Sequence, residues 1–199
     1  FTFLRYKSSS TADTTENSQS LNIDGDGSRV LKLYYARRDD INLTLTSDLP
    51  VAVESMSISV GGTPAEGTTN VDVTYGKSVT VSVTLKAGYS FTNFTSSPSI
   101  TGTNGSSDST YTFAFTMPYK DTTITAHLTR NTNTSFNIRY MFEKIETDGL
   151  TGAARFEENE ELRATGTGTP DDPITRELLA GQGKVLSVTG FTYSGVGVI

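Results

Sequence analysis

A two-residue alternation of apolar and polar side chains is the feature of this sequence that most limits its fold. In the run SVTVSVTL, Val79, Val81 and Val83 point one way, whereas Thr80 and Ser82 point the other. The same alternation recurs at 53–60, 109–117, 122–128 and 135–142. Each such segment is predicted to be a strand with one buried and one solvated face, as antiparallel sheets usually have. Because Ser and Thr also exceed a quarter of the chain, we expect a mostly-β protein with polar turns.

Glycine-containing pairs between the strand patterns predict the turns. Asp-Gly and Asn-Gly pairs supply the positive φ that tight hairpins require. Turns are therefore expected at Asp24–Gly27, Gly61–Gly62, Tyr75–Lys77 and Thr103–Gly105.

One short helix is expected in TPDDPITRELLAGQG. Asp172 can cap its first turn, and Pro173 fits the first helical position. Leu178 and Leu179 supply an apolar stripe, and Gly181 or Gly183 ends the helix.

Two similar junctions divide the chain into three parts. RVLKLYYARRDDINLTL and TITAHLTRNTNTSFNIRY each contain a strand, an arginine, a short polar linker and a new strand. The boundaries give a closing hairpin and strand (1–38), a complete all-β module (39–130) and an opening strand-strand-helix-strand part (131–199). Placed end to end, 131–199 followed by 1–38 has the element order of one β-grasp module. Since an unpaired edge beside an open core should not be stable alone, we expect a 1–38 segment to complete a 131–199 part.

These segments resemble modules of bacterial cell-surface proteins. IDGDGSRVLKLYYARR is similar to the end of repeats of the mucin-binding-protein and internalin B-repeat type, and TSFNIRYMFEKIETDG and VTGFTYS to their start and middle. GYSFTNFTSSPS and YTFAFTMPYKDTTITAHL resemble divergent B-repeat modules. The resemblance implies tandem β-grasp-like modules in stalks, adhesin arrays or fibres on a bacterial surface, and no catalytic residues. For the middle module a small β-sandwich stays open, because it produces the same alternation.

Composition excludes several classes of partner. The net charge of −6 and a pI near 4.8 argue against nucleic acid, which requires clustered Lys and Arg. No apolar run approaches the roughly 20 residues of a membrane helix, so no membrane insertion is expected. Cysteine is absent, which removes disulfides, thiol catalysis and cysteine metal sites. No cofactor is expected.

Few residues are candidates for chemistry. His127, the single histidine, lies on the solvated face of its strand pattern with Thr123 and Thr125, and no nucleophile elbow such as G-x-S-x-G occurs. We therefore expect an exposed strand histidine and no enzyme. Asp24, Asp26 and Ser28 in NIDGDGS are weak candidates for a calcium loop, but Tyr35 stands where an EF-hand needs a bidentate Glu. A hairpin turn is the favoured interpretation.

The remaining candidates concern binding. The acidic run at Glu157–Glu161 could hold a cation or a basic partner, although such runs are usually solvated faces that Arg155 and Arg163 partly neutralise. The predicted inter-module strand comprises Val30, Leu31, Leu33 and Tyr35. Tyr34 opposes Leu33 and Tyr35 on this strand and is the candidate for a glycan contact, whereas Tyr89, Phe91 and Phe94 favour packing.

The sequence is compatible with two functions. The first is a structural repeat of an extracellular surface stalk or fibre, whose partners are adjacent copies of the same repeat, either covalent or strand-complemented. The second is an adhesin module that binds a host glycan or mucin.

Overall fold

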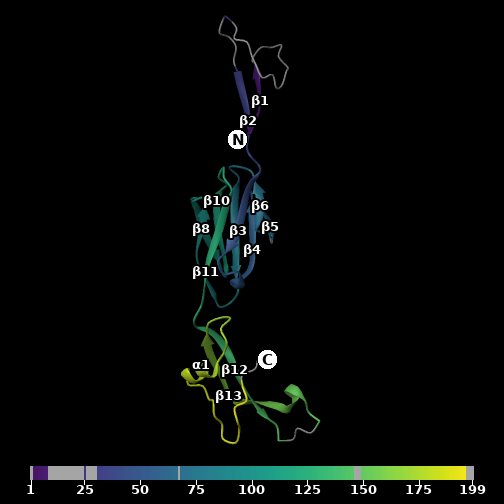
Figure 1. Ribbon diagram of the computed structural model, residues 1–199, viewed down its shortest axis with the longest axis vertical. Coiled ribbons are helices and arrows are strands. Elements are labelled where there is room, and N and C mark those ends of the chain that lie inside the picture. Colours follow the sequence, from purple (N-terminus) through teal and green to yellow (C-terminus); the bar gives the residue numbers. More distant parts are fainter. Residues whose placement is uncertain (1, 9–24, 26–30, 67, 146–148, 196–199) are drawn as a thin grey trace. The chain divides into compact units, whose positions relative to one another are not determined.

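A computed structural model describes residues 2–8, 25, 31–66, 68–145 and 149–195 (Figure 1). The described residues form two compact units. The first draws on 1–86 and 91–128, and the second on 87–90 and 129–199. The described residues are mostly β, as the alternation predicted, and contain one short α-helix.

The N-terminal part is a two-stranded antiparallel sheet. Strand β1 (Thr2–Ser8) pairs with β2 (Leu31–Ala36), and the register places Phe3 opposite Tyr35 and Lys7 opposite Lys32. The predicted closing strand is therefore formed over Leu31–Ala36.

Residues 41–130 form two sheets, which we call the sandwich. The five-stranded sheet has the order β5-β4-β7-β10-β9, and the four-stranded sheet has the order β6-β3-β11-β8. The strands are β3 (Ile41–Ser47), β4 (Val53–Val60), β5 (Thr63–Glu66), β6 (Asn70–Val73), β7 (Ser78–Leu85), β8 (Tyr89–Ser97), β9 (Gly102–Ser107), β10 (Thr110–Thr116) and β11 (Thr122–Arg130). A 3₁₀ turn, η1 (Pro50–Ala52), joins β3 to β4. Strands β3 and β11 run parallel, with Leu43 opposite Thr122.

This arrangement corrects the β-grasp expectation for the middle module in favour of the sandwich alternative. A β-grasp module needs a helix across its sheet, and no α-helix occurs in the described part of 41–130. Both sheets instead bury apolar rows against each other, as the alternation of buried and half-buried residues along β7 shows. The fully buried side chains include Ile41, Leu43, Ile58, Val81, Met117 and Ile124.

The turn predictions are right at two positions and wrong at one. Gly61 and Gly62 both have positive φ, and Gly76 lies in the turn between β6 and β7. The turn expected at Thr103–Gly105 is instead strand β9. Its glycines serve close packing, because a Cβ on Gly102 would lie 2.5 Å from the Phe113 ring and one on Gly105 would lie 2.7 Å from the Thr112 hydroxyl. The chain turns after β9 instead, with Asp108 at φ 50°.

The second unit, which we call the C-terminal unit, is built on a long hairpin. Strand β12 (Thr134–Glu143) pairs antiparallel with β13 (Phe156–Gly168), and a 3₁₀ turn, η2 (Gly152–Arg155), precedes β13. Helix α1 (Arg176–Gly181) follows. The third strand expected near Gly190–Tyr193 is represented among the described residues by a single bridge between Val188 and Phe191.

The helix begins later than predicted. Thr175, not Asp172, is its N-cap, and its hydroxyl accepts a hydrogen bond from the Leu178 amide at 3.2 Å. Pro173 lies before the helix, and Asp171 has a φ of 66°, a left-handed conformation that a helix cannot contain. The prediction of its end is confirmed, because α1 ends at Gly181.

Candidate functional site

The apolar row of β12 is the first candidate surface. As predicted, Phe136, Ile138, Tyr140 and Phe142 alternate with the exposed positions Asn137, Arg139 and Met141, but each of the four is only half-buried. The Phe142 ring meets that of Phe191 at a centroid distance of 4.4 Å. Leu179 is the one buried apolar side chain among the described residues of this unit. Packing within this unit therefore leaves the side chains of the β12 row partly exposed to solvent.

The two edges of the β12–β13 hairpin differ. The side chain of Gln182 accepts a hydrogen bond from the Thr167 amide at 3.0 Å and donates one to the Thr167 carbonyl at 2.5 Å. Gln182 thus bonds the outer edge of β13 in the way a neighbouring strand would. In the sheet that the structure describes, β12 has β13 as its one neighbour, so the other edge of β12 carries no strand.

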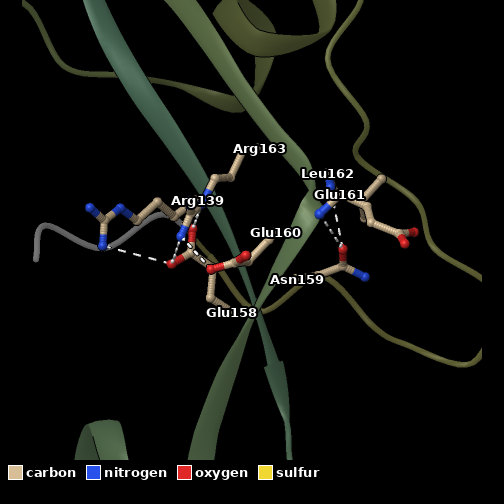
Figure 2. A network of polar contacts seen from close by, with 7 residues as sticks. All are labelled: Arg139, Glu158, Asn159, Glu160, Glu161, Leu162 and Arg163. Carbon is tan, nitrogen blue, oxygen red and sulfur yellow. Dashed lines mark hydrogen bonds and ion pairs between the residues drawn. The ribbon is translucent and has the colours of Figure 1, made fainter.

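The acidic run lies in β13, and Figure 2 shows that two arginines point toward Glu158 from either side. Glu158 accepts hydrogen bonds from Arg163 Nε at 2.5 Å and Nη2 at 3.0 Å, and Arg139 Nη1 lies 3.7 Å from its carboxylate. Arg163 also donates to Glu160 at 3.0 Å. The hydrogen bonds from Arg163 lower the pKa of Glu158 despite an opposing effect of burial. The prediction that Arg163 neutralises part of the run is confirmed, whereas Arg155 pairs with Glu143 instead.

A bulge shapes this network. The register jumps from Ile138 opposite Ala164 to Tyr140 opposite Asn159, so four residues of β13 face Arg139. The Asn159 side chain accepts from the amides of Glu161 and Leu162 at 3.1 and 3.3 Å (Figure 2). The sequence held a signal for this bulge, since an asparagine among four glutamates favours a side-chain-bonded turn over a strand.

His127 has partners that the sequence did not reveal. Its Nδ1 lies 2.8 Å from Asp48 Oδ2, and its Nε2 lies 2.8 Å from the Thr95 hydroxyl. Asp48 Oδ1 also accepts from the Leu128 amide at 3.0 Å. Burial raises the pKa of Asp48, but the hydrogen bonds from His127 and Leu128 outweigh it and the net pKa is lowered. These contacts fasten the end of β3 to β11 and β8.

The same three residues have the connectivity of a hydroxyl-imidazole-carboxylate triad. With Nδ1 protonated and donating to Asp48, Nε2 accepts from Thr95. Thr95, however, is a secondary hydroxyl within a paired strand, whereas hydrolase nucleophiles stand on sharp turns beside amides that stabilise an oxyanion. The arrangement therefore supports a structural role for His127.

Two half-buried aromatic residues of β8 pack against aromatic rings of β10. The Phe91 ring stacks on that of Tyr111 at 4.4 Å, and Phe94 meets Phe113 at 6.0 Å. Tyr89 donates a hydrogen bond to Asp171 at 2.6 Å, within the C-terminal unit. The packing interpretation is therefore supported for Phe91 and Phe94.

The other candidates receive no test. Asp24, Asp26, Ser28 and Val30 lie outside the described residues, and so do the side chains of Leu31, Leu33 and Tyr34. Tyr35 is 55% exposed. A glycan contact at Tyr34 and a metal at Asp24 stay predictions, and no group of three or more potential metal ligands occurs in the part of the chain that was described.

Comparisons with known proteins agree with one part of the chain. A family model described as the divergent InlB B-repeat domain matches residues 54–132, which lie almost wholly in the sandwich. The match supports an InlB-like bacterial repeat, a kind typical of bacterial surface proteins. No curated protein and no solved structure matches the chain. Among the described helices, none has the length and apolar character to cross a membrane.

Proposed function

We propose that the chain is a structural repeat of an extracellular bacterial stalk, adhesin array or fibre. Its modules are joined head to tail, and residues 1–38 of one copy complete a 131–199-type module of the next. The InlB-like repeat supports the surface role. The observation that carries the joining is the half-buried β12 row, because a unit with one buried apolar side chain among its described residues lacks the apolar burial that stabilises a domain.

Deletion of residues 1–38 tests the joining. The full chain and the 39–199 chain are compared by hydrogen exchange over a series of protein concentrations. We expect protection of β12 and β13 to rise with concentration in the full chain and to stay low in the shortened one. The sandwich amides serve as an internal control, because their core lies within 41–128. Equal protection of β12 in both chains would contradict the proposal.

The mass of the native material tests the form of the array. A denatured mass several times 21.4 kDa indicates a covalent array, which we favour as the more economical way to keep neighbouring copies together. A mass near 21.4 kDa indicates separate subunits completed by their neighbours.

A further inference from the structure

We infer that the outer edge of β12 is the acceptor edge, and that its occupant is the β1–β2 hairpin of a second copy of this chain. The inference rests on the proposed function and assigns the contact to a particular edge and partner. Both ends of the described chain hold two-stranded sheets, β1–β2 and β12–β13. A two-stranded sheet is marginally stable in water, and three or more strands with an apolar face are needed for independent stability. Pairing the two hairpins edge to edge gives one four-stranded sheet.

The contacts of Gln182 identify which backbone groups face outward. Since Gln182 bonds both the amide and the carbonyl of Thr167, these groups point away from β12. Residues opposed across an antiparallel pair either exchange both bonds or point both groups outward, in alternation. Ser135, opposite Thr167, therefore directs its amide and carbonyl to the free edge of β12, and so does Asn137, opposite Thr165.

The opposite edge is less suited to accept a strand. Gln182 already occupies the Thr167 groups of β13, and α1 holds Gln182 at its C-terminal cap. The bulge after Asn159 further interrupts β13, and bulges are a common way to prevent pairing at an edge. Strand addition is therefore directed to β12.

Charge identifies the occupant. The β1 and β2 segments carry Arg5, Lys7 and Lys32 and no carboxylate, and the register places Lys7 opposite Lys32. Like charges at opposed positions destabilise a strand pair. The segments of β12 and β13 carry five glutamates against two arginines; Glu143, Glu158 and Glu160 pair with nearby arginines, so the acidic excess lies at Glu157 and Glu161. The basic β1–β2 hairpin and the acidic β12–β13 hairpin therefore have complementary charges that favour their association.

A pair of proline variants tests the edge in the full chain. Proline removes one amide, and at Asn137 that amide faces the free edge of β12, so the bonds between β12 and β13 are kept. Thr165→Pro is the matched control, because it removes the outward amide of β13 directly opposite. We expect Asn137→Pro to weaken self-association, measured by sedimentation velocity, by about tenfold or more and Thr165→Pro to leave it within about twofold.

Residue-resolved hydrogen exchange on the unaltered chain tests the same edge of β12 without a variant. The amides of Ser135 and Asn137 should gain protection as protein concentration rises. Sensitivity to Thr165→Pro instead of Asn137→Pro would overturn the choice of edge. Protection that is independent of concentration would mean that the chain's own hairpin is the occupant, which overturns the second-copy assignment.

The Lys7→Glu/Lys32→Glu double variant tests the partner. We expect it to abolish association at low salt, and the same two residues changed to Arg should retain association. If the charge-reversed variant still associates but deletion of 1–38 abolishes association, the proposed function is supported and the charge-based docking is refuted. If the unaltered chain does not self-associate and the amides of β12 stay unprotected at every concentration, both the proposed function and the assignment of the β12 edge are refuted.

Discussion

The sandwich and the C-terminal unit are built from strands of the same alternating pattern, yet they differ in what the pattern buries. Sixteen of the seventeen buried apolar side chains in the described residues lie between Ile41 and Leu128, and one, Leu179, lies in the C-terminal unit. Along β7 every second residue is buried, whereas along β12 every second residue is half-buried. Alternation therefore specifies a strand and its apolar face, and the second layer decides whether that face becomes a core.

A matched pair of isoleucines should show the largest difference between the two units. Ile124 is fully buried in β11, and Ile138 is half-buried in β12. Ile124→Ala should cost about 2–5 kcal/mol of unfolding free energy, since it removes buried methylenes and leaves a cavity. Ile138→Ala should cost under about 1 kcal/mol in the unassociated chain, because solvent already reaches the side chain.

Urea unfolding followed by circular dichroism and tyrosine fluorescence measures both variants. Dilute protein keeps the chain unassociated, and the β12 variant is repeated at high concentration. A larger loss for Ile138→Ala at high concentration is expected if an added strand covers it. Equal costs in dilute solution would mean that the C-terminal unit already has a complete core.

Two glycines give a second comparison with a smaller expected effect. A Cβ on Gly102 would lie 2.5 Å from the Phe113 ring and 2.6 Å from the Ala114 carbonyl oxygen. A Cβ on Gly166 would meet the Phe136 ring just as closely, but no backbone atom is as near. Phe136 is half-buried and can move, whereas the Ala114 carbonyl is fixed within a paired strand.

Gly102→Ala is therefore expected to cost about 1–3 kcal/mol, and Gly166→Ala about half as much or less. Thermal unfolding of the two variants measures the difference. Gly181→Ala, where a Cβ meets nothing within 4 Å, is the control without a steric clash, and it should not destabilise because alanine favours a helix over glycine. A greater loss for Gly166→Ala would indicate that the Phe136 ring is held more rigidly than its partial exposure suggests.

These positions also show how far the sequence predicts the structure. The strands at 53–60, 78–85 and 134–143 followed from local periodicity, which depends only on neighbours in the chain. The turn prediction at Thr103–Gly105 failed because its glycines make room for Phe113 and Thr112 on another strand, and local sequence does not record such contacts. The helix cap is Thr175, whose hydroxyl accepts from the Leu178 amide, and not Asp172; both residue types can cap a helix, so the sequence alone does not choose between them.

The candidate site also contains features that local sequence predicts and contacts that it does not. Alternation predicted the apolar row of β12 and the polar face that holds Arg139. The contact of His127 with Asp48 joins residues 79 positions apart, and the contact of Gln182 with Thr167 depends on where the helix lies against β13. Contacts between residues far apart in the sequence depend on the order of the strands in the sheets. The alternation of apolar and polar residues does not specify that order.

The smallest expected effect compares acid sensitivity in the two units. The pKa of Asp48 in the sandwich and the pKa of Glu158 in the C-terminal unit are both lowered in the folded protein. A lowered folded pKa contributes stability that is present above the unfolded value, about 4, and is lost as pH falls through the folded value. Both carboxylates should therefore stabilise their units at pH 7 and stop doing so in the acid range below about pH 4.

Asn substitution at Asp48 separates this contribution from general acid unfolding. Asp48→Asn should lower the unfolding free energy of the sandwich at pH 7 by under about 1 kcal/mol, since the side chain is partly exposed and screened. The difference from the unaltered chain should shrink to nothing as pH falls below the folded pKa. Glu158→Gln should change only the C-terminal unit, with the same pH dependence. A destabilisation by Asp48→Asn that persists undiminished at pH 2 would show that Asp48 acts through packing, because a protonated carboxyl has lost the negative charge that the hydrogen bonds from His127 and Leu128 stabilise.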